Sequence, residues 1–286
     1  MTFIDFARAN GVEIDPSRLF PSEKIRRCGT VEKPRSGNGA YFWDGERGWV
    51  MDWSGEARVI WFQNDKGKPW TEEEKRLWAQ KRASAAQDIE RRHLQAASHA
   101  EADLKRAEVK EHNYLKYKGL GEEKGLVLDD KLLVPMRNVV TNKVQGYQAI
   151  RWDETERKYE KKMYPGMRAK NAVFYLGSRM SPAAWLVEGY ATGLSLRAAL
   201  RSCGMEAAVV VCFSASNLIQ VADQIKGQRY VFADNDESQT GQKAAEATGL
   251  PWVMAETVGW DANDLHIHNG LFAVVKKVME ARCKRS

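Results

Sequence analysis

Short apolar runs alternate with helical patterns through the last third of the chain. We expect strands at 183–190, 206–214, 229–234 and 251–256, and helices at 191–202, 217–226, 241–249 and 271–281. Continuously apolar strands that alternate with helices are typical of a parallel sheet covered by helices on both faces. Such a sheet binds its ligands beyond the carboxyl ends of its strands, so functional residues are expected at that edge.

Acidic residues stand at the ends of three of the expected strands. Glu188 ends the first strand, Asp234 and Asp236 end the third, and Asp261 follows the fourth, with Asp264 shortly after. In a parallel sheet these carboxylates would emerge at one edge, where they would repel each other unless cations neutralised them. Oxygen ligands without an accompanying Cys or His set favour Mg²⁺ or Mn²⁺. The alternative is that these acids are helix N-caps and turn residues, positions where Asp is favoured for backbone reasons.

Several common cofactor and metal motifs are missing from the sequence. The first strand–helix turn reads EGYATG instead of G-x-G-x-x-G, and no G-x-x-x-x-G-K-[ST] loop occurs. The four cysteines are widely spaced without a C-x-x-C pair, so a zinc ribbon is not supported. No apolar run reaches the ~18 residues of a membrane span, and the N-terminus lacks the apolar core of a signal peptide. We therefore expect a cytoplasmic protein without a membrane partner.

Positive charge is concentrated in one segment of the chain. The net charge is +6, and residues 113–180 hold 14 Lys and Arg against 8 Asp and Glu, an excess equal to the whole net charge. We expect this segment to be mainly β. A polyanion such as nucleic acid is its natural partner, and the alternative is an ordinary solvated basic surface. The candidate nucleotide- or DNA-binding residues in this segment are Lys116, Lys118, Arg137, Arg168 and Lys170.

The first 112 residues divide into two regions of different composition. Residues 1–70 are rich in turns and aromatics, which predicts a small β-rich domain. Its tryptophans either fill the core or form a stacking platform for single-stranded bases; they are Trp43, Trp49, Trp53 and Trp61. Residues 71–112 are dominated by alanine and charge, without Pro or Gly, which predicts one long, largely solvated helix that connects two domains.

The order and spacing of several motifs resemble a known family. LVEGYATGLSL, VFADND and DANDLH resemble the Toprim domain of DnaG-type primases, topoisomerases and related nucleases. Upstream, EHNYLKYKGL, LLVPMRN, GYQAI and NAVFYLG are similar to the basic subdomain that precedes Toprim in the primases of phages and mobile elements. The resemblance covers roughly residues 111–268. It implies an α/β Toprim domain at 181–286 and a basic primase subdomain at 113–180, which follow the helical linker and the N-terminal domain expected from composition.

The resemblance implies roles for individual residues. Glu188 matches the family's acid–base or metal-binding glutamate, and Asp234 and Asp236 match the D-x-D pair that holds metal ions. Asp261 matches a downstream acidic cluster, with Asp264 as a substitute where the family often has a second Asp and this chain has Asn263. The family also usually has an acid at the position of Thr192. Arg168 and Lys170 stand where the family places basic residues facing the nucleotide or the primer–template.

The N-terminal region departs most from the family. Many such primases begin with a zinc ribbon, whereas RRCGTVEKPRSGNGAYFWDGERGWV contains a single cysteine and resembles a metal-free counterpart. Its basic residues would grip single-stranded template together with the nearby aromatics; they are Arg26, Arg27 and Arg35.

The function that we expect is template-directed synthesis of short primers on single-stranded DNA from nucleoside triphosphates. Metal-dependent nucleotidyl transfer at Glu188, Asp234 and Asp236 would form each bond, and any replicative helicase partner would be a separate chain. Two alternatives stay open. One is a Toprim nuclease that hydrolyses phosphodiesters with similar metals. The other is a non-catalytic DNA-binding replication or interference protein, which Thr192 and Asn263 favour.

Overall fold

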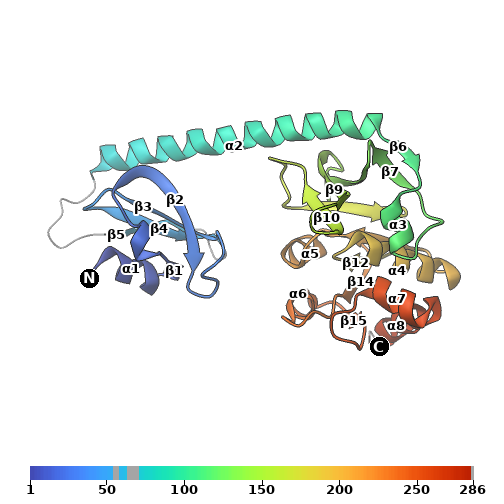
Figure 1. Cartoon of the computed structure of the whole chain (residues 1–286). Coiled ribbons are helices and arrows are strands. Elements are labelled where there is room, and N and C mark those ends of the chain that lie inside the picture. The colour runs from blue at the N-terminus through green and yellow to red at the C-terminus, as the bar shows by residue number, and fades with distance from the viewer. Residues whose placement is uncertain (54–57, 63–70, 285–286) are drawn as a thin grey trace. The chain divides into compact units, whose positions relative to one another are not determined.

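The computed structural model in Figure 1 describes residues 1–53, 58–62 and 71–284, so residues 54–57 and 63–70 of the predicted N-terminal domain lie outside it. The chain divides into two compact units, residues 1–83 and residues 84–286. The boundary between them falls within one helix, α2 (Glu72–Arg106). Among the described residues, no helix combines the length and the apolar character that crossing a bilayer requires.

The first unit is a five-stranded antiparallel sheet with a short helix against one face. The helix α1 (Phe3–Ala9) begins in a capping box between Thr2 and Asp5. The sheet has the order β1-β2-β3-β4-β5, with bounds Val12–Glu13, Ser22–Thr30, Gly39–Trp43, Gly48–Asp52 and Ile60–Phe62. A single turn of 3₁₀ helix, η1 (Pro16–Arg18), precedes β2. Phe3 of α1 is buried and stacks on Trp43, with ring centroids 4.6 Å apart.

The helix α2 is shorter than the sequence predicts. It ends at Arg106, and Glu108–Lys110 form β6 instead of a continued helix. The backbone of β6 pairs with β7 (Gly125–Leu128), so these residues exchange helical hydrogen bonds for sheet hydrogen bonds. Most described side chains of α2 are exposed, and two small residues near its end, Ala96 and Ala100, are buried against the second unit's strands.

The second unit is built on one mixed sheet of ten strands. The main strand order is β10-β9-β8-β11-β13-β12-β14-β15, with β6 and β7 attached beside β8. The remaining strand bounds are β8 Lys131–Asn138, β9 Val144–Asp153, β10 Lys158–Met163, β11 Ala172–Leu176, β12 Ala183–Val187, β13 Ala207–Val211, β14 Gln228–Ala233 and β15 Trp252–Met254. The four strands from β12 to β15 are parallel, and β11 runs antiparallel to both β8 and β13. The strands of the last third are therefore parallel to one another, as the sequence predicts, and the sheet as a whole is mixed because antiparallel strands of the preceding segment continue it.

The strand β11 joins the predicted basic segment to the predicted Toprim region. It pairs with β8 on one side and with β13 on the other, so both regions share one continuous sheet. Covering this sheet are α3 (Asn113–Tyr117), α4 (Tyr190–Ser202), α5 (Ala215–Ala222), α6 (Thr240–Ala247), α7 (Ala262–Asn269) and α8 (Leu271–Cys283). Apolar side chains of α4, α7 and α8 pack on one face, and those of α5 and α6 pack on the other. This two-sided cover explains why the strands are apolar throughout.

Candidate metal centre and nucleic-acid surface

The structure brings Glu188 and Asp234 to the same edge of the sheet. Glu188 directly follows β12 and Asp234 directly follows β14, and these two strands are parallel neighbours with Leu186 opposite Val231. The carboxyl ends of both strands therefore meet at one place. Asp236 lies two residues beyond Asp234, and Asn235 between them is fixed by a bridge to Trp260.

Asp234 is the most perturbed carboxylate at this edge. Burial raises the pKa of Asp234 to about 8, and the negative charges of Asp261, Glu188 and Asp236 add to that effect. The positive charge of Lys161 acts in the opposite direction. The Oδ1 atom of Asp234 is buried and has no hydrogen-bond partner among the described residues. Burying a carboxylate oxygen without a hydrogen-bond donor costs free energy, and a cation bound to this oxygen would offset that cost.

The surroundings of Glu188 and Asp236 shift the pKa values of these two residues in opposite directions. Burial, with a smaller contribution from Asp236, raises the pKa of Glu188 above its usual value, against a hydrogen bond from the Ala215 backbone N–H. Hydrogen bonds lower the pKa of Asp236 to about 2, first from the Ser238 hydroxyl and then from the backbone N–H of Gly241. The Gly241 nitrogen lies 2.9 Å from Asp236 Oδ2. The site thus pairs a carboxylate that is fixed as an anion with two that are poorly solvated.

Asp261 and Asp264 form a capping box at the start of α7, a helix that the sequence interpretation missed. Asp261 Oδ1 accepts hydrogen bonds from the backbone nitrogens of Asn263 and Asp264 at 2.6 and 3.0 Å. Asp264 Oδ2 accepts from the Asp261 nitrogen at 3.2 Å. The remaining Asp261 oxygen, Oδ2, accepts from the Thr192 hydroxyl at 2.9 Å. The N-cap alternative therefore describes these two acids, and the D-x-x-D spacing in DANDLH is the signal that could have predicted the helix.

Asn263 ties three parts of the unit together. Its side chain is fully buried, and its Nδ2 donates to the Lys118 carbonyl at 2.9 Å and to Ser195 Oγ at 3.0 Å. A carboxylate at this position could not donate either hydrogen bond. The two departures from the family pattern, Thr192 and Asn263, thus both belong to a hydrogen-bond network around α7.

The carboxylates at this edge are suited to bind Mg²⁺ or a similar ion through a small number of protein ligands. Among the described residues, no group of three or more His, Cys, Asp or Glu side chains is placed to hold an ion together. Mg²⁺ is usually bound by one or two carboxylates and completes its shell with waters and substrate phosphates. Asp234, with its unpartnered Oδ1, and the ionised Asp236 match that mode, with Glu188 beside them.

The predicted basic residues have different surroundings. Lys118 reaches Asp264 at 3.7 Å, Lys116 pairs with Glu111 at 2.8 Å, and Arg168 pairs with Glu90 of α2. Arg137 is exposed and donates to the Asn142 carbonyl, and Lys170 lies at the rim of a pocket beside β13. In the first unit, Arg26 lies over the Phe20 ring and Arg27 over the Trp53 ring, and Arg35 is exposed. Lys118 is therefore the predicted residue that the structure brings to the acidic edge.

Lys161 is a site residue that the sequence interpretation did not single out. It lies on β10 and its charge lowers the pKa of Asp234. Its Nζ also lies 5.6 Å from the centroid of the Tyr114 ring. Because side chains alternate along a strand, Tyr159, Lys161 and Met163 share one face of β10. The sequence interpretation expected residues 113–180 to be mainly β but did not place a strand at Lys158–Met163, and the pairing partners of β10 were not visible in the sequence.

The tryptophans of the predicted stacking platform differ in exposure, and a group of exposed aromatic rings lies in the basic segment. Trp49 is 1% exposed and belongs to the core, whereas Trp53 is 51% exposed. In the second unit, Tyr117 is 68% and Trp152 is 40% exposed, and both pack on Tyr159 with ring centroids 5.4 and 5.1 Å apart. These three residues, which we call the aromatic cluster, line a cavity of about 590 Å³ together with His112, Asn113, Asp130 and Glu154.

Comparison with known proteins assigns the last third of the chain. Residues 183–270 match the sequence model of the Toprim domain. Toprim domains occur in primases, nucleases, topoisomerases and recombination proteins. They are usually catalytic and bind divalent metal ions such as Mg²⁺. No curated protein matches the chain.

Proposed function

We propose that this protein is a DNA primase that makes short primers on single-stranded DNA by metal-dependent nucleotidyl transfer. The observation that carries the proposal is the burial of the Asp234 carboxylate without a full set of hydrogen-bond partners in the described part of the chain. Its buried Oδ1 has no hydrogen-bond partner among the described residues, and it lies beside Glu188 and Asp236 at the edge where α/β sheets bind their ligands. A cluster of this kind favours a divalent cation and, through it, the phosphate oxygens of a nucleotide.

Each side chain at the edge has a role that follows from its surroundings. Asp234 and Asp236 would hold Mg²⁺ or Mn²⁺, with Glu188 beside them. Such an ion, when bound, neutralises phosphate oxygens and stabilises charge on the attacking and leaving oxygens. Glu188, whose pKa is raised by burial, is suited to accept a proton from the terminal hydroxyl of the growing strand. The oxygen of that hydroxyl attacks the α-phosphorus of the incoming nucleoside triphosphate. The bond from that phosphorus to pyrophosphate breaks in the same step.

The basic segment supports polymerisation on a strand in preference to hydrolysis. The face of β10 that carries Lys161 also carries Tyr159, so the aromatic cluster and the acidic edge are connected along one strand. Exposed rings stack single-stranded bases with little sequence preference. Lys118 adds a positive charge 3.7 Å from Asp264. We infer that the template lies across the aromatic cluster and that the nucleotide lies at the acidic edge.

The main rival is a non-catalytic DNA-binding protein. Thr192 and Asn263 favour it, because both replace family acids and both are engaged in hydrogen bonds around α7. The unpartnered Oδ1 of Asp234 opposes it, since a pure binding module has no need of a buried carboxylate without a donor. A Toprim nuclease uses similar metals, and only the basic segment and its aromatic cluster favour primer synthesis over it.

A primer-synthesis assay separates these functions. The protein is incubated with mixed single-stranded DNA templates, labelled nucleoside triphosphates and Mg²⁺ or Mn²⁺. Asp234→Asn removes the candidate ligand, and Asp223→Asn is the matched control, because the Asp223 side chain is 90% exposed and pairs with Arg229. We expect short labelled products from the wild type and the control, and none from Asp234→Asn.

The other outcomes reassign the protein. Shortened template without new product would make it a nuclease, and binding without either product would make it a DNA-binding module. Thermal unfolding supplies an independent readout of the metal. We expect Mg²⁺ to raise the melting temperature of the wild type and of Asp223→Asn but not that of Asp234→Asn, since ligands stabilise only the state that binds them.

A further inference from the structure

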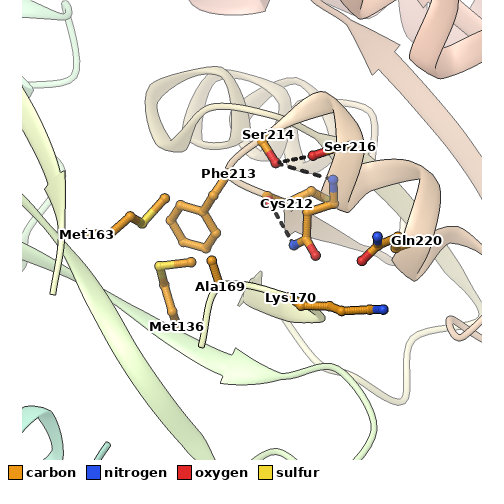
Figure 2. Close-up of a pocket in the computed structure, with 10 residues that line it drawn as sticks. Met136, Met163, Ala169, Lys170, Cys212, Phe213, Ser214, Ser216 and Gln220 are labelled. Atoms are coloured by element: carbon orange, nitrogen blue, oxygen red, sulfur yellow. Dashed lines mark hydrogen bonds between the residues drawn. The ribbon is translucent and has the colours of Figure 1, made fainter. Parts of the chain in front are cut away.

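A pocket of about 210 Å³ opens beside the acidic edge, and Lys170 is the one of its lining residues for which the sequence predicts a role. Its walls come from both halves of the shared sheet. Met136 is on β8, Met163 ends β10, and Phe213 follows β13, one strand away from Glu188 (Figure 2). The Phe213 nitrogen donates to the Glu188 carbonyl at 2.9 Å, so the pocket and the candidate metal centre are directly connected.

The apolar wall presents the ring of Phe213 between two thioethers. Figure 2 shows this ring between the side chains of Met136 and Met163. The backbone of Phe213 has φ of +66°, a left-handed conformation that is rare for a bulky residue. Backbone strain of this kind costs free energy and is found at ligand sites, where it holds a side chain in place. Here it directs an aromatic ring into an open pocket.

The polar rim offers groups that a ligand can use. Ser214 and Ser216 bond to each other, and the Asn217 side chain donates to the Ala172 and Cys212 carbonyls and accepts from the Asn171 backbone N–H. By contrast, in the described part of the chain the Lys170 ammonium and the Gln220 side-chain amide have neither a hydrogen bond nor an ion pair. The rim therefore combines an unpaired cation with an amide that both donates and accepts.

We propose that this pocket binds the base of a nucleotide, with the ring of Phe213 stacked on the base and Lys170 on a phosphate. The inference rests on the proposed function and assigns recognition of the nucleotide base to this pocket. Pockets that enclose a whole drug-sized ligand measure ~300–1,000 Å³, so this smaller one suits a single ring system. A nucleotide has a flat heterocycle that matches the apolar wall and a phosphate that matches the cation at the rim.

The base could belong to a free nucleoside triphosphate or to single-stranded DNA, and binding assays distinguish the two. We would measure dissociation constants in EDTA for ATP, for inorganic triphosphate and for a short labelled single-stranded oligonucleotide. Phe213→Asn removes the ring and suits the left-handed backbone, whereas Phe213→Tyr keeps the ring. Lys170→Gln removes the cation. Its control is Lys226→Gln, because Lys226 precedes β14 at the opposite edge of the sheet.

The expected results differ for each variant. Phe213→Asn should weaken ATP binding by roughly 5- to 150-fold, the range of one base–aromatic stack, and leave inorganic triphosphate unchanged. Lys170→Gln should weaken both, and Phe213→Tyr and Lys226→Gln should weaken neither. If only oligonucleotide binding responds to Phe213→Asn, the base belongs to a DNA strand. Thermal unfolding of each variant checks that the fold is intact, and Phe213→Leu replaces Phe213→Asn if that variant unfolds.

Unchanged affinity of both ATP and the oligonucleotide in a folded ring-less variant would overturn the proposal. This failure is distinct from failure of the proposed function. If the protein makes primers but binds nucleotides independently of Phe213, only the proposal about the pocket fails. If the protein makes no primers but needs Phe213 to bind ATP in EDTA, the proposal about the pocket stands and the proposed primase function fails.

Discussion

The hydroxyl of Thr192 donates a hydrogen bond to Asp261 Oδ2 at 2.9 Å, and this contact occupies the last free oxygen of that carboxylate. The other Asp261 oxygen already accepts from two backbone nitrogens of α7. Asp261 is therefore committed to capping a helix, although it lies near Asp234 and its charge raises the pKa of that residue. Asp234 is the carboxylate of this edge that keeps a buried oxygen without a partner among the described residues, so it is the best-placed ligand for a cation.

Replacement of Thr192 tests this division of roles. Thr192→Val keeps the shape and removes the donor, which should lower the free energy of unfolding by about 1–3 kcal/mol, because the side chain is fully buried and Asp261 loses a partner. Thr192→Asp should cost more in EDTA, since it adds a second buried carboxylate beside Asp261. We expect Mn²⁺ to raise the stability of Thr192→Asp by more than that of Thr192→Val, which gains no additional carboxylate. Urea unfolding with and without Mn²⁺ measures both, and equal behaviour of the two variants would contradict the idea.

Lys161→Met should affect metal and nucleotide in opposite directions. Removing this cation makes the acidic edge more negative, so Mg²⁺ should bind more tightly and ATP more weakly, each by about twofold to fivefold for an exposed charge. Lys158→Met is the matched control, because it removes a lysine from the opposite face of the same strand. Isothermal titration gives both constants. A change of the same sign for the two ligands would show that Lys161 acts through the fold and not through its charge.

Gly241→Ala should disturb the acidic edge through the backbone. A Cβ at this position would lie 2.3 Å from the Asp234 carbonyl oxygen, so either α6 or Asp234 must move. We expect a loss of about 1–3 kcal/mol in unfolding free energy, the usual cost of overpacking, together with weaker Mg²⁺ binding. Gly121→Ala is the control, since a Cβ there meets only a side-chain atom of Lys116 at 3.6 Å. Equal stability of the two variants by urea unfolding would refute the expected crowding.

Tyr114→Phe should stabilise the protein. The Tyr114 hydroxyl is buried without a hydrogen-bond partner among the described residues, so its removal should raise the unfolding free energy by about 1 kcal/mol at pH 8. Tyr147→Phe is the contrasting variant and should destabilise, because the Tyr147 hydroxyl donates to Asp103 at 3.0 Å. A stability loss in Tyr114→Phe would mean that the hydroxyl has a partner, such as a bound water.

The same variant should change the response to alkaline pH. Burial raises the pKa of Tyr114 to about 12, above its ordinary value of about 10. The folded state therefore keeps this proton where the unfolded state releases it, and the stability that depends on it is lost as the pH rises from about 10 toward 12. Tyr114→Phe should lose less stability across that interval than the wild type, measured by urea unfolding at pH 8, 10 and about 11. Parallel curves for the two proteins would contradict this assignment.

Local chemistry in the sequence was sufficient to predict much of the second unit. Alternation of apolar runs and helices predicted β12, β13, β14 and β15 and the helices between them, since each run is buried on both faces. The strand-end positions of Glu188 and Asp234 predicted that they meet, because parallel strands end at one edge. The match of residues 183–270 to the Toprim domain agrees with those motifs.

Tertiary structure decided which partner each polar or aromatic side chain finds. Whether Asp261 faces a metal or a helix N-terminus depends on the position of Thr192, which lies 69 residues away in the sequence. Whether Trp49 is core and Trp152 is exposed depends on how sheets are covered, which composition does not encode. The antiparallel pairing of β11 with β13 joins the basic segment to the acidic edge and places Lys161 near Asp234. Periodicity along a chain is a local property, whereas partners across strands are set only when the whole sheet has formed.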